Sequence, residues 1–208
     1  MRLRNVKNKE EIMNSSNYLI RDPFIYKGKW NKYFNNDNPI YIEIGMGKGK
    51  FIIDNALNNP DINFIGIEKY DSVIVKGLQK IEDNAPNLCM VRADANTIED
   101  IFDHEISKIF LNFSDPWPKN RHQERRLSSP TFLKKYDSLF KDKKYIEMRT
   151  DNSDLFTYSL VSFSNNKYIL EEVSLDLHKD NPPLITTEYE DKFSGKGMPI
   201  YFIKCFKD

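Results

Sequence analysis

The residues best suited to chemistry in this chain of 208 residues lie between Lys108 and Leu127, in the segment KIFLNFSDPWPKNRHQERRL. An apolar strand pattern ends at Asp115, where two prolines one residue apart force the backbone out of any sheet. The turn presents a carboxylate and a large ring, Trp117, and a basic run follows, namely Lys119, Arg121, His122, Arg125 and Arg126. An acid beside a flat ring, backed by cations, suits a nucleobase on a phosphate backbone. The alternative interpretation is a strand end with a rigid proline turn and a solvated charged face.

A second candidate segment is the glycine turn at 45–49, which follows the predicted strand 40–44 and precedes a helical pattern through Leu57. Strand, glycine turn and helix open a nucleotide-binding unit, in which Gly45 and Gly47 let the backbone pass close to a ligand. The spacing is not the GxGxxG of dinucleotide binders, and the chain has no Gly-Lys-Ser/Thr for a P-loop. Taken alone, the turn could therefore be a tight connection that binds nothing.

Acidic residues mark the ends of the first three strands of this predicted sheet. Glu43 lies just before the glycine turn, Glu68 ends the strand 63–67, and Asp94 follows the strand 88–92. The carboxyl ends of parallel strands share one edge of a sheet, so the three acids should gather there. They disfavour a phosphate-rich cofactor such as NAD and favour S-adenosylmethionine, which carries a sulfonium, an ammonium, a ribose and no phosphate. Each acid singly could instead be a helix cap or a solvated loop carboxylate.

Asp115 and Asp151 extend the pattern to the fourth and fifth strands. Asp115 would face the reacting methyl group. Asp151 follows the strand 145–148, but Thr150 to Ser153 is also a good N-cap signal, so both interpretations stay open. The three histidines show no metal-ligand spacing, so no metal site is predicted.

The elements that must position these residues alternate between strand and helix. Further helical patterns lie at 71–84, 98–102 and 131–140, and another runs up to Phe163. Two β-like segments follow at 168–177 and 199–206. A long polar loop separates the last two. Five alternations predict an α/β fold, Rossmann-like, with a mostly parallel doubly wound sheet and an antiparallel C-terminal strand.

Composition and charge narrow the class of protein. Charged residues make up 30% and hydrophobic ones 39%, which predicts a soluble globular protein, although the net charge of zero gives no global field for nucleic acid. Residues 1–38 are polar with scattered aromatics and predict a partly ordered arm over a single domain at 39–208. Cys89 and Cys205 lie in apolar segments and indicate buried, reduced thiols of a cytoplasmic protein. No apolar run reaches the length of a membrane span, so no membrane association is predicted.

Six motifs follow one another over most of the chain: IEIGMGKGKF at 42–51, FIGIEKY at 64–70, RADA at 92–95, LNFSDPWPKNRHQERRL at 111–127, RTDN at 149–152 and TTEYEDKF at 186–193. In sequence and order they resemble the bacterial tRNA (guanine-N7)-methyltransferases of the TrmB family, and the DPWPK-x-RH-x-x-RR run is highly specific. The resemblance implies a class I methyltransferase fold and methylation of N7 of the guanine at position 46 in the tRNA variable loop. S-adenosylmethionine would be the methyl donor and S-adenosylhomocysteine the product.

The resemblance also implies roles for individual residues. It implies cofactor contacts by Glu43, Glu68, Asp94 and Asp115, and either Asp94 or Asn96 could meet the adenine. The residues implied in tRNA or guanine contacts are Lys119, Asp151, Thr187, Glu188, Tyr189 and Glu190. Whether the protein is a monomer or a homodimer stays open.

The chemistry assigns Asp115 the catalytic role. Guanine N7 carries a lone pair and no proton at neutral pH, so methylation needs alignment of the reactants rather than a general base. Asp115, helped by Asp151 or Glu190, is predicted to accept from guanine N1–H, a hydrogen bond that strengthens as positive charge reaches the base. Arg121, Arg125 and Arg126 are predicted to contact phosphates of the tRNA.

Two other functions fit the sequence less well. A non-catalytic RNA-binding protein on the same frame would have no use for four strand-end acids, which repel phosphate. An amine or small-molecule methyltransferase would not need the basic run that follows Asp115.

Overall fold

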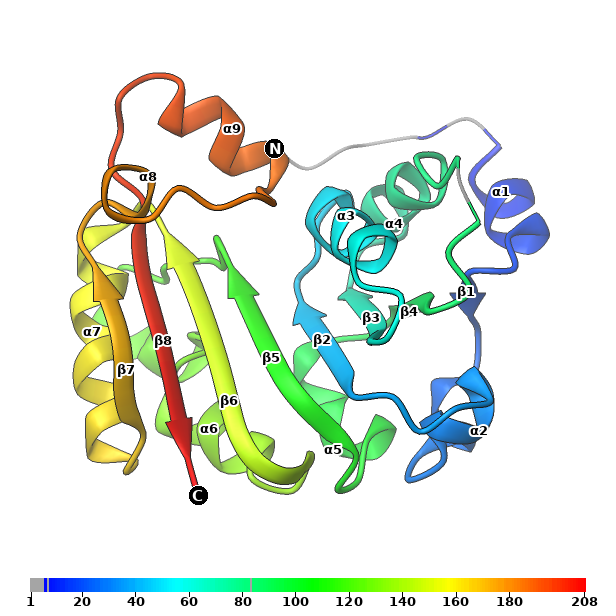
Figure 1. Ribbon diagram of the computed structural model, residues 1–208, viewed down its shortest axis with the longest axis horizontal. Coiled ribbons are helices and arrows are strands. Elements are labelled where there is room, and N and C mark those ends of the chain that lie inside the picture. The colour runs from blue at the N-terminus through cyan, green and yellow to red at the C-terminus, as the bar shows by residue number, and fades with distance from the viewer. Residues whose placement is uncertain (1–5, 7, 83) are drawn as a thin grey trace.

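The computed structural model describes residues 6, 8–82 and 84–208. The strands of this part form one eight-stranded sheet in the order β1-β4-β3-β2-β5-β6-β8-β7 (Figure 1). Their bounds are β1 Leu19–Ile20, β2 Ile40–Ile44, β3 Asn63–Glu68, β4 Leu88–Arg92, β5 Ile106–Asn112, β6 Phe140–Thr150, β7 Ile169–Ser174 and β8 Tyr201–Lys207. All neighbours from β1 to β6 pair in parallel, and β8 is antiparallel to both β6 and β7. The predicted fold class is therefore confirmed.

The sheet changes its direction of growth between β2 and β5. The chain adds β3 and β4 on one side of β2, and then returns to place β5 and β6 on the other side. In an open parallel sheet such a switch point leaves a crevice at the carboxyl ends of the two central strands. Glu43 on β2 and Asn112 at the end of β5 lie at this switch.

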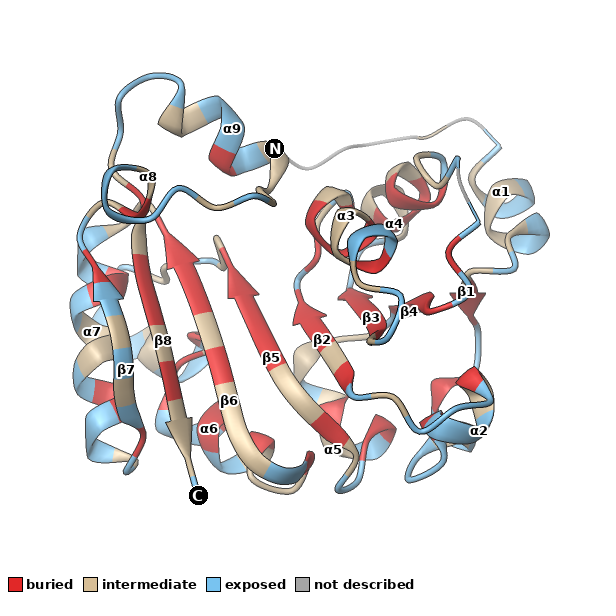
Figure 2. Ribbon diagram, in the orientation of Figure 1, coloured by how far each residue is buried: buried red, intermediate tan, exposed pale blue. Residues whose placement is uncertain are grey.

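Helices cover the sheet from two sides and bury two apolar clusters. The helix bounds are α1 Lys9–Ser15, α2 Trp30–Phe34, α3 Lys50–Asn58, α4 Asp71–Leu78, α5 Ile98–Ile101, α6 Pro130–Tyr136, α7 Ser153–Asn165, α8 Leu177–Asp180 and α9 Glu188–Ser194, with 3-10 turns at Pro23–Tyr26, Ala95–Thr97 and Asn120–Arg125. Residues of α3 and α4 form one cluster with Met90 and Phe110. Residues of α2, α5, α6 and α7 form the other (Figure 2). The buried side chains concentrate on the inner strands, which hold the site edge rigid.

Several predicted elements differ from the structure. The helix expected at 71–84 ends at Leu78, and residue 83 lies outside the described residues. The helix expected at 131–140 ends at Tyr136, because Phe140 already begins β6. The segment between the last two β-like segments, which was predicted as a long polar loop, contains α9 and most of α8. Thr187 caps α9 and pairs with Glu190 in a capping box, a signal that the sequence carried.

The N-terminal residues contribute to the sheet and to the core. Leu19 and Ile20 pair with Met90 and Val91 of β4, which makes β1 an edge strand. Trp30 is fully buried and donates through Nε1 to the carbonyl oxygen of Ile101 at 3.0 Å. The division into an arm at 1–38 and a domain at 39–208 stays a prediction, and residues 1–5 and 7 lie outside the described part of the chain.

Trp30→Ala should lower the free energy of unfolding by about 3–5 kcal/mol, because a large buried ring leaves a cavity that the core cannot close. Phe24 is the matched control, since its ring lies in the same segment and is 53% exposed. Phe24→Ala should change stability by less than about 0.5 kcal/mol. Urea unfolding measures both, and equal losses would mean that the segment around Trp30 is not part of the core.

Candidate functional site

The glycine turn between β2 and α3 presents bare backbone at the switch point. Gly45, Gly47 and Gly49 have φ angles of +80°, +59° and +76°, a region that other residues enter only with strain. The amides of Gly45 and Met46 both donate to the carbonyl oxygen of Ile67, at 2.8 and 3.0 Å, and so fix the turn to the end of β3. A ligand can therefore approach this turn closely without meeting side chains.

Glu43 is a buried carboxylate with a free oxygen. Its side chain is 1% exposed, and Oε1 accepts from Asn112 Nδ2 at 2.9 Å. Its Oε2 has no hydrogen-bond partner among the described residues. Burial raises the pKa of Glu43 to about 7, although the Asn112 hydrogen bond and the charge of Arg149 oppose this. Since a buried charge without a partner is costly, the site fits a ligand that brings a cation to Oε2.

Glu68 lies at the end of β3 and is held by backbone amides. Its Oε2 accepts from the amide of Gly47 at 3.2 Å, and its Oε1 accepts from the amide of Tyr70 at 2.9 Å. Burial raises its pKa, the backbone hydrogen bonds lower it, and the charge of Asp115 raises it further. Each carboxylate oxygen has a second lone pair, so Glu68 can still accept from the hydroxyls of a ribose.

Asp94 and Asn96 form one unit rather than two alternatives. Asp94 Oδ1 accepts from both the amide and the side chain of Asn96 at 2.9 Å, and Oδ2 lies 2.6 Å from Lys69 Nζ. Partial burial raises the pKa of Asp94, but the hydrogen bond and charge of Lys69 outweigh it, so that the pKa is lowered. The unit caps the 3-10 turn at Ala95–Thr97 next to the end of β4.

Asp115 is exposed on a turn whose shape depends on Arg126. The Arg126 side chain donates through Nε to the carbonyl oxygen of Pro116 at 2.9 Å and through Nη2 to that of Trp117 at 3.2 Å. Its guanidinium also lies over the ring of Tyr158, 4.2 Å from the centroid. Arg126 is only 5% exposed, so its predicted phosphate contact is not supported. The structure places this cation inside the molecule because the turn has carbonyl oxygens that need donors.

The other predicted basic residues do lie on the surface. Lys119, Arg121 and Arg125 are exposed, and none of them forms an ion pair with the described part of the chain. The guanidinium of Arg125 lies over Trp117 at 5.0 Å, and the ring of His122 meets Trp117 edge-on at 5.8 Å. The cations and the aromatic ring thus form a surface next to Asp115, as the sequence indicated.

Asp151 is not the cap of α7. That role belongs to Asn152, whose Oδ1 accepts from the amide of Leu155 at 2.8 Å. Asp151 Oδ2 instead accepts from the hydroxyl of Tyr189 on α9 at 3.0 Å. Burial first, and then the Asp151 carboxylate, raise the pKa of Tyr189 to about 12. The N-cap signal at Thr150 to Ser153 is therefore met by Asn152, and a contact of Asp151 with the substrate stays a prediction.

The predicted residues of α9 face different environments. Glu190 is fully buried and forms an ion pair with Arg149, so it does not present its carboxylate to a substrate. Thr187 accepts from the amide of Glu190 as the cap of the helix. Glu188 pairs with Lys48 of the glycine turn at 2.9 Å and with Lys80 after α4. Tyr189 is 42% exposed, and the Glu188 side chain is 39% exposed but paired with both lysines.

Three residues that join the site were not singled out from the sequence. Asn112 holds Glu43, Arg149 holds Glu190, and His178 lies 2.9 Å from the other oxygen of Glu190. Asn112 and Arg149 were inside the quoted motifs. Nothing in the sequence around His178 indicated a role.

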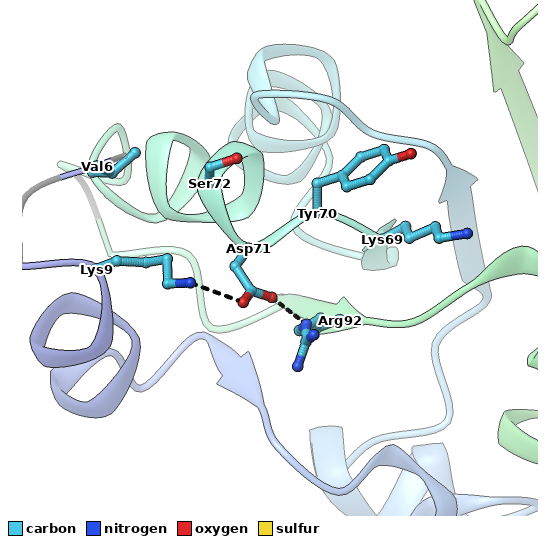
Figure 3. A pocket seen from close by; sticks show the side chains of 7 residues that line it. All are labelled: Val6, Lys9, Lys69, Tyr70, Asp71, Ser72 and Arg92. Carbon is cyan, nitrogen blue, oxygen red and sulfur yellow. Dashed lines mark hydrogen bonds and ion pairs between the residues drawn. The ribbon is translucent and has the colours of Figure 1, made fainter. Parts of the chain in front are cut away.

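A hollow of about 300 Å³ lies beside the sheet edge that carries the predicted cofactor residues (Figure 3). It lies where Lys69 follows β3 and Arg92 ends β4, and α1 closes it with Lys9. In Figure 3 Lys9 and Arg92 both reach Asp71, whose single negative charge offsets one of their two positive charges. A neighbouring hollow of about 310 Å³ shares these three residues. The acids predicted to bind a cofactor do not line either one.

The described residues show neither a cluster of metal ligands nor a helix that could span a membrane. Within the described residues, no group of three or more His, Cys, Asp or Glu side chains could hold a metal ion. None of the helices described is both long and apolar enough to cross a membrane.

Comparisons with known proteins agree with this geometry. A family described as "Putative methyltransferase" matches residues 37–203. A tRNA (guanine-N(7)-)-methyltransferase of Bacillus velezensis is 53% identical over 193 residues, which cover 91% of this chain and 89% of that protein. The protein of the same name from Listeria monocytogenes is 55% identical over 189 residues, 89% of this chain and 88% of its own. That from Lachnoclostridium phytofermentans is 46% identical and covers 100% of this chain and 99% of its own.

Solved structures share the fold at low sequence identity. A structure titled as an antibiotic-related methyltransferase has a TM-score of 0.65 and 18% identity, over 86% of this chain and 92% of that one. The 16S rRNA methyltransferase KamB has a TM-score of 0.64 and 10% identity over the same shares. These structures support the methyltransferase fold.

The raised pKa of Glu43 predicts a pH-dependent stability of the ligand-free protein. The folded state holds the proton up to about pH 7, whereas an unfolded carboxyl releases it near its usual pKa of 4.5. The contribution of Glu43 to the free energy of unfolding is therefore intact below about pH 4.5 and falls by about 3 kcal/mol by pH 7.

Glu43→Gln has no proton to lose at this position. Urea unfolding of both proteins at pH 5 and pH 8 should show the wild type losing stability relative to the variant as the pH rises. Parallel pH profiles for the two proteins would show that Glu43 does not hold its proton in the folded state.

Proposed function

The chain belongs to the tRNA (guanine-N(7)-)-methyltransferase family, and we propose that it methylates N7 of guanine in tRNA with S-adenosylmethionine as the methyl donor. The finer expectation, position 46 of the variable loop, is part of this proposal. The assignment of the cofactor rests on Glu43, next to the glycine turn, whose buried Oε2 has no hydrogen-bond partner among the described residues. Its need for a cation matches the ammonium group of that cofactor. A tRNA substrate implies activity in the cytoplasm, and the match over 37–203 supports one methyltransferase domain.

The residues of the cofactor edge would divide the ligand between them. Glu43 would meet the ammonium, Glu68 the ribose hydroxyls, and the Asp94–Asn96 unit the adenine. The backbone at Gly45 and Gly47 would pass close to the amino-acid end of S-adenosylmethionine. When bound, S-adenosylmethionine supplies an electrophilic methyl group on a sulfonium sulfur. The acids of the chain favour this cationic ligand over the neutral product, which helps product release.

The surface beyond the edge would hold the tRNA. Lys119, Arg121 and Arg125 are exposed cations with no ion-pair partner among the described residues, so they are available to phosphates. Trp117 offers a ring face beside them, although Arg125 already lies over it. Asp115 lies beside these cations, whereas Glu43 is buried on β2. A phosphate backbone can therefore bind without approaching Glu43.

The chain has to align guanine rather than activate it. N7 has an in-plane lone pair, so no residue needs to remove a proton from the nucleophile, and ideal positioning is worth up to about 7–11 kcal/mol. Asp115 would accept from N1–H and the exocyclic amine, and Asp151 would help from the end of β6. Both hydrogen bonds become stronger as positive charge develops on the base, which is stabilisation of the transition state.

Incubation of the protein with bulk tRNA and labelled S-adenosylmethionine tests the function. Nuclease digestion and mass analysis should find 7-methylguanosine at one position. A protein that binds tRNA but gives no heat on titration with S-adenosylmethionine would be the non-catalytic RNA-binding protein. Cofactor turnover with an amine and none with tRNA would indicate a small-molecule methyltransferase.

Arg125 and Arg126 should separate phosphate binding from support of the turn. Arg125→Ala should lower the tRNA affinity and reduce the slope of its salt dependence by about one unit, because the side chain is exposed. Arg126→Ala should leave that slope unchanged and lower the free energy of unfolding by about 1–3 kcal/mol, because two part-buried carbonyl oxygens lose their donor. Lys141→Ala, an exposed cation on β6 away from the site edge, is the control for the loss of charge. A reduced slope for Arg126→Ala would return Arg126 to the RNA surface.

Asp115→Asn should keep the fold and most of the tRNA affinity while it slows methyl transfer. The amide retains an acceptor but loses the charge that follows the developing cation, a loss of about 2–4 kcal/mol by analogy with oxyanion sites. Single-turnover rates at saturating cofactor and tRNA measure this. Asp61→Asn, at an exposed position before β3, is the control. A wild-type rate for Asp115→Asn, with only cofactor affinity reduced, would make Asp115 a cofactor ligand alone.

A further inference from the structure

The Glu190 carboxylate is enclosed, and both of its oxygens accept from donors within the chain. Oε2 accepts from Arg149 Nη1 at 3.0 Å and from the amide of Thr187 at 3.2 Å. Oε1 lies 2.9 Å from His178 Nε2, and since a carboxylate can only accept, His178 donates. The side chain is 0% exposed. A guanine could reach Glu190 only by displacing these partners.

Arg149 connects Glu190 to the end of β6. Its Nη1 also donates to the carbonyl oxygen of Ile185 at 2.9 Å, and its guanidinium lies 5.1 Å from the ring of Phe51 on α3. Its backbone carbonyl oxygen accepts from the amide of Phe113 at 2.8 Å, two residues before Asp115. Arg149 therefore binds the segment leading into α9 with its side chain and the segment leading to Asp115 with its backbone.

His178 brings a third element to the same carboxylate. It lies on α8, where Leu177 is buried with Ile200 and Phe202. The His178 side chain is 28% exposed, whereas that of Glu190 is entirely enclosed. Glu190 thus joins β6, α8 and α9 through its two carboxylate oxygens. In Figure 1, α8 and α9 lie together beyond the ends of β6 and β8.

The residue that this arrangement presents is Tyr189. Its hydroxyl donates to Asp151 Oδ2 at 3.0 Å, and its ring lies 4.9 Å from Phe113 and 4.3 Å from Phe193. Tyr189 directly precedes Glu190, so the same turn of α9 carries both the ring and the buried carboxylate. A buried carboxylate that loses a partner cannot stay in place without cost, because its charge is then unbalanced.

We propose that Arg149 and His178 are positioning residues for methyl transfer, which hold Glu190 and so fix α9 with Tyr189 against Asp151. This rests on the proposed function. It assigns Thr187 and Glu190 to the support of α9 and leaves Tyr189 and Asp151 to meet guanine together with Asp115. The alternative is that Glu190 releases His178 and itself contacts guanine through Oε1, in which case loss of His178 would not slow the reaction.

His178 decides between the two, because it touches Glu190 and is not placed in the binding surface. His178→Ala should slow single-turnover methyl transfer about tenfold at saturating tRNA and cofactor, the scale of a lost hydrogen bond to a charged group. The affinity for S-adenosylmethionine should stay within about twofold, because the cofactor acids are not disturbed. His178→Gln retains an N–H donor and should recover most of the rate. His104→Ala, an exposed histidine beside Asp103, should have the wild-type rate.

A double-mutant cycle with Glu190→Gln tests whether both residues act through one contact. The double variant should be no slower than the slower single variant, because each change breaks the same interaction. A wild-type rate for His178→Ala, or single effects that multiply in the double variant, would overturn the proposal.

Hydrogen exchange gives a readout that does not require activity. Amides of α9 should exchange faster in His178→Ala than in His104→Ala, while those of β5 stay protected. If the wild-type protein transferred no methyl group to tRNA, the proposed function would fail, and exchange would still test the support of α9. Unchanged exchange in α9 together with a wild-type rate would remove His178 from any such role, and His178→Gln serves if the alanine variant does not fold.

Discussion

A carboxylate buried without a full set of partners is the constraint around which the cofactor edge is arranged. Glu43 sits at the switch point of the sheet, where β2 parts from β5 and leaves space for a ligand. Asn112 satisfies one of its oxygens and not the other. The low dielectric around it disfavours its own charge, as the raised pKa shows, and strengthens its attraction for a cation. The ligand-free edge is therefore prepared for a cationic ligand at a cost in its own stability.

Although the net charge of the chain is zero, its acidic and basic residues gather on different surfaces, one suited to S-adenosylmethionine and one to tRNA. Acids at the strand ends would attract a sulfonium compound and repel phosphate. Cations after the proline turn, Lys119 and Arg121 among them, would do the opposite. Lys69 and Arg92, which lie closer to the cofactor edge, pair with Asp94 and Asp71 and so add little free positive charge. Each ligand thus has one surface of suitable sign.

The sequence predicted the parts of the site that depend on chain order, and missed those that depend on distant contacts. Strand ends in a parallel sheet meet at one edge whatever the loops do, so Glu43, Glu68 and Asp115 could be placed by pattern alone. Glu190 and Arg126 could not, because charged residues in polar segments normally lie at the surface. Their burial depends on partners 41 residues and about ten residues away along the chain. Helix α9 was missed for a similar reason, since a short polar helix is stable only with its cap and its contacts to the sheet.

The two buried charges share one physical task. Arg126 supplies donors to the carbonyl oxygens of the proline turn, and Glu190 supplies acceptors to the segment around α9. The turn needs this support, since Phe113 and Trp117 on either side of Asp115 have φ angles of 50° and 42°. Such conformations cost about 1–3 kcal/mol each for bulky residues and persist only where the surroundings enforce them. The amide of Phe113 donates to the backbone carbonyl oxygen of Arg149, whereas the carbonyl oxygen of Trp117 accepts from the side chain of Arg126. The backbone that presents Asp115 is therefore fixed on one side by the backbone of β6 and on the other by a buried side chain.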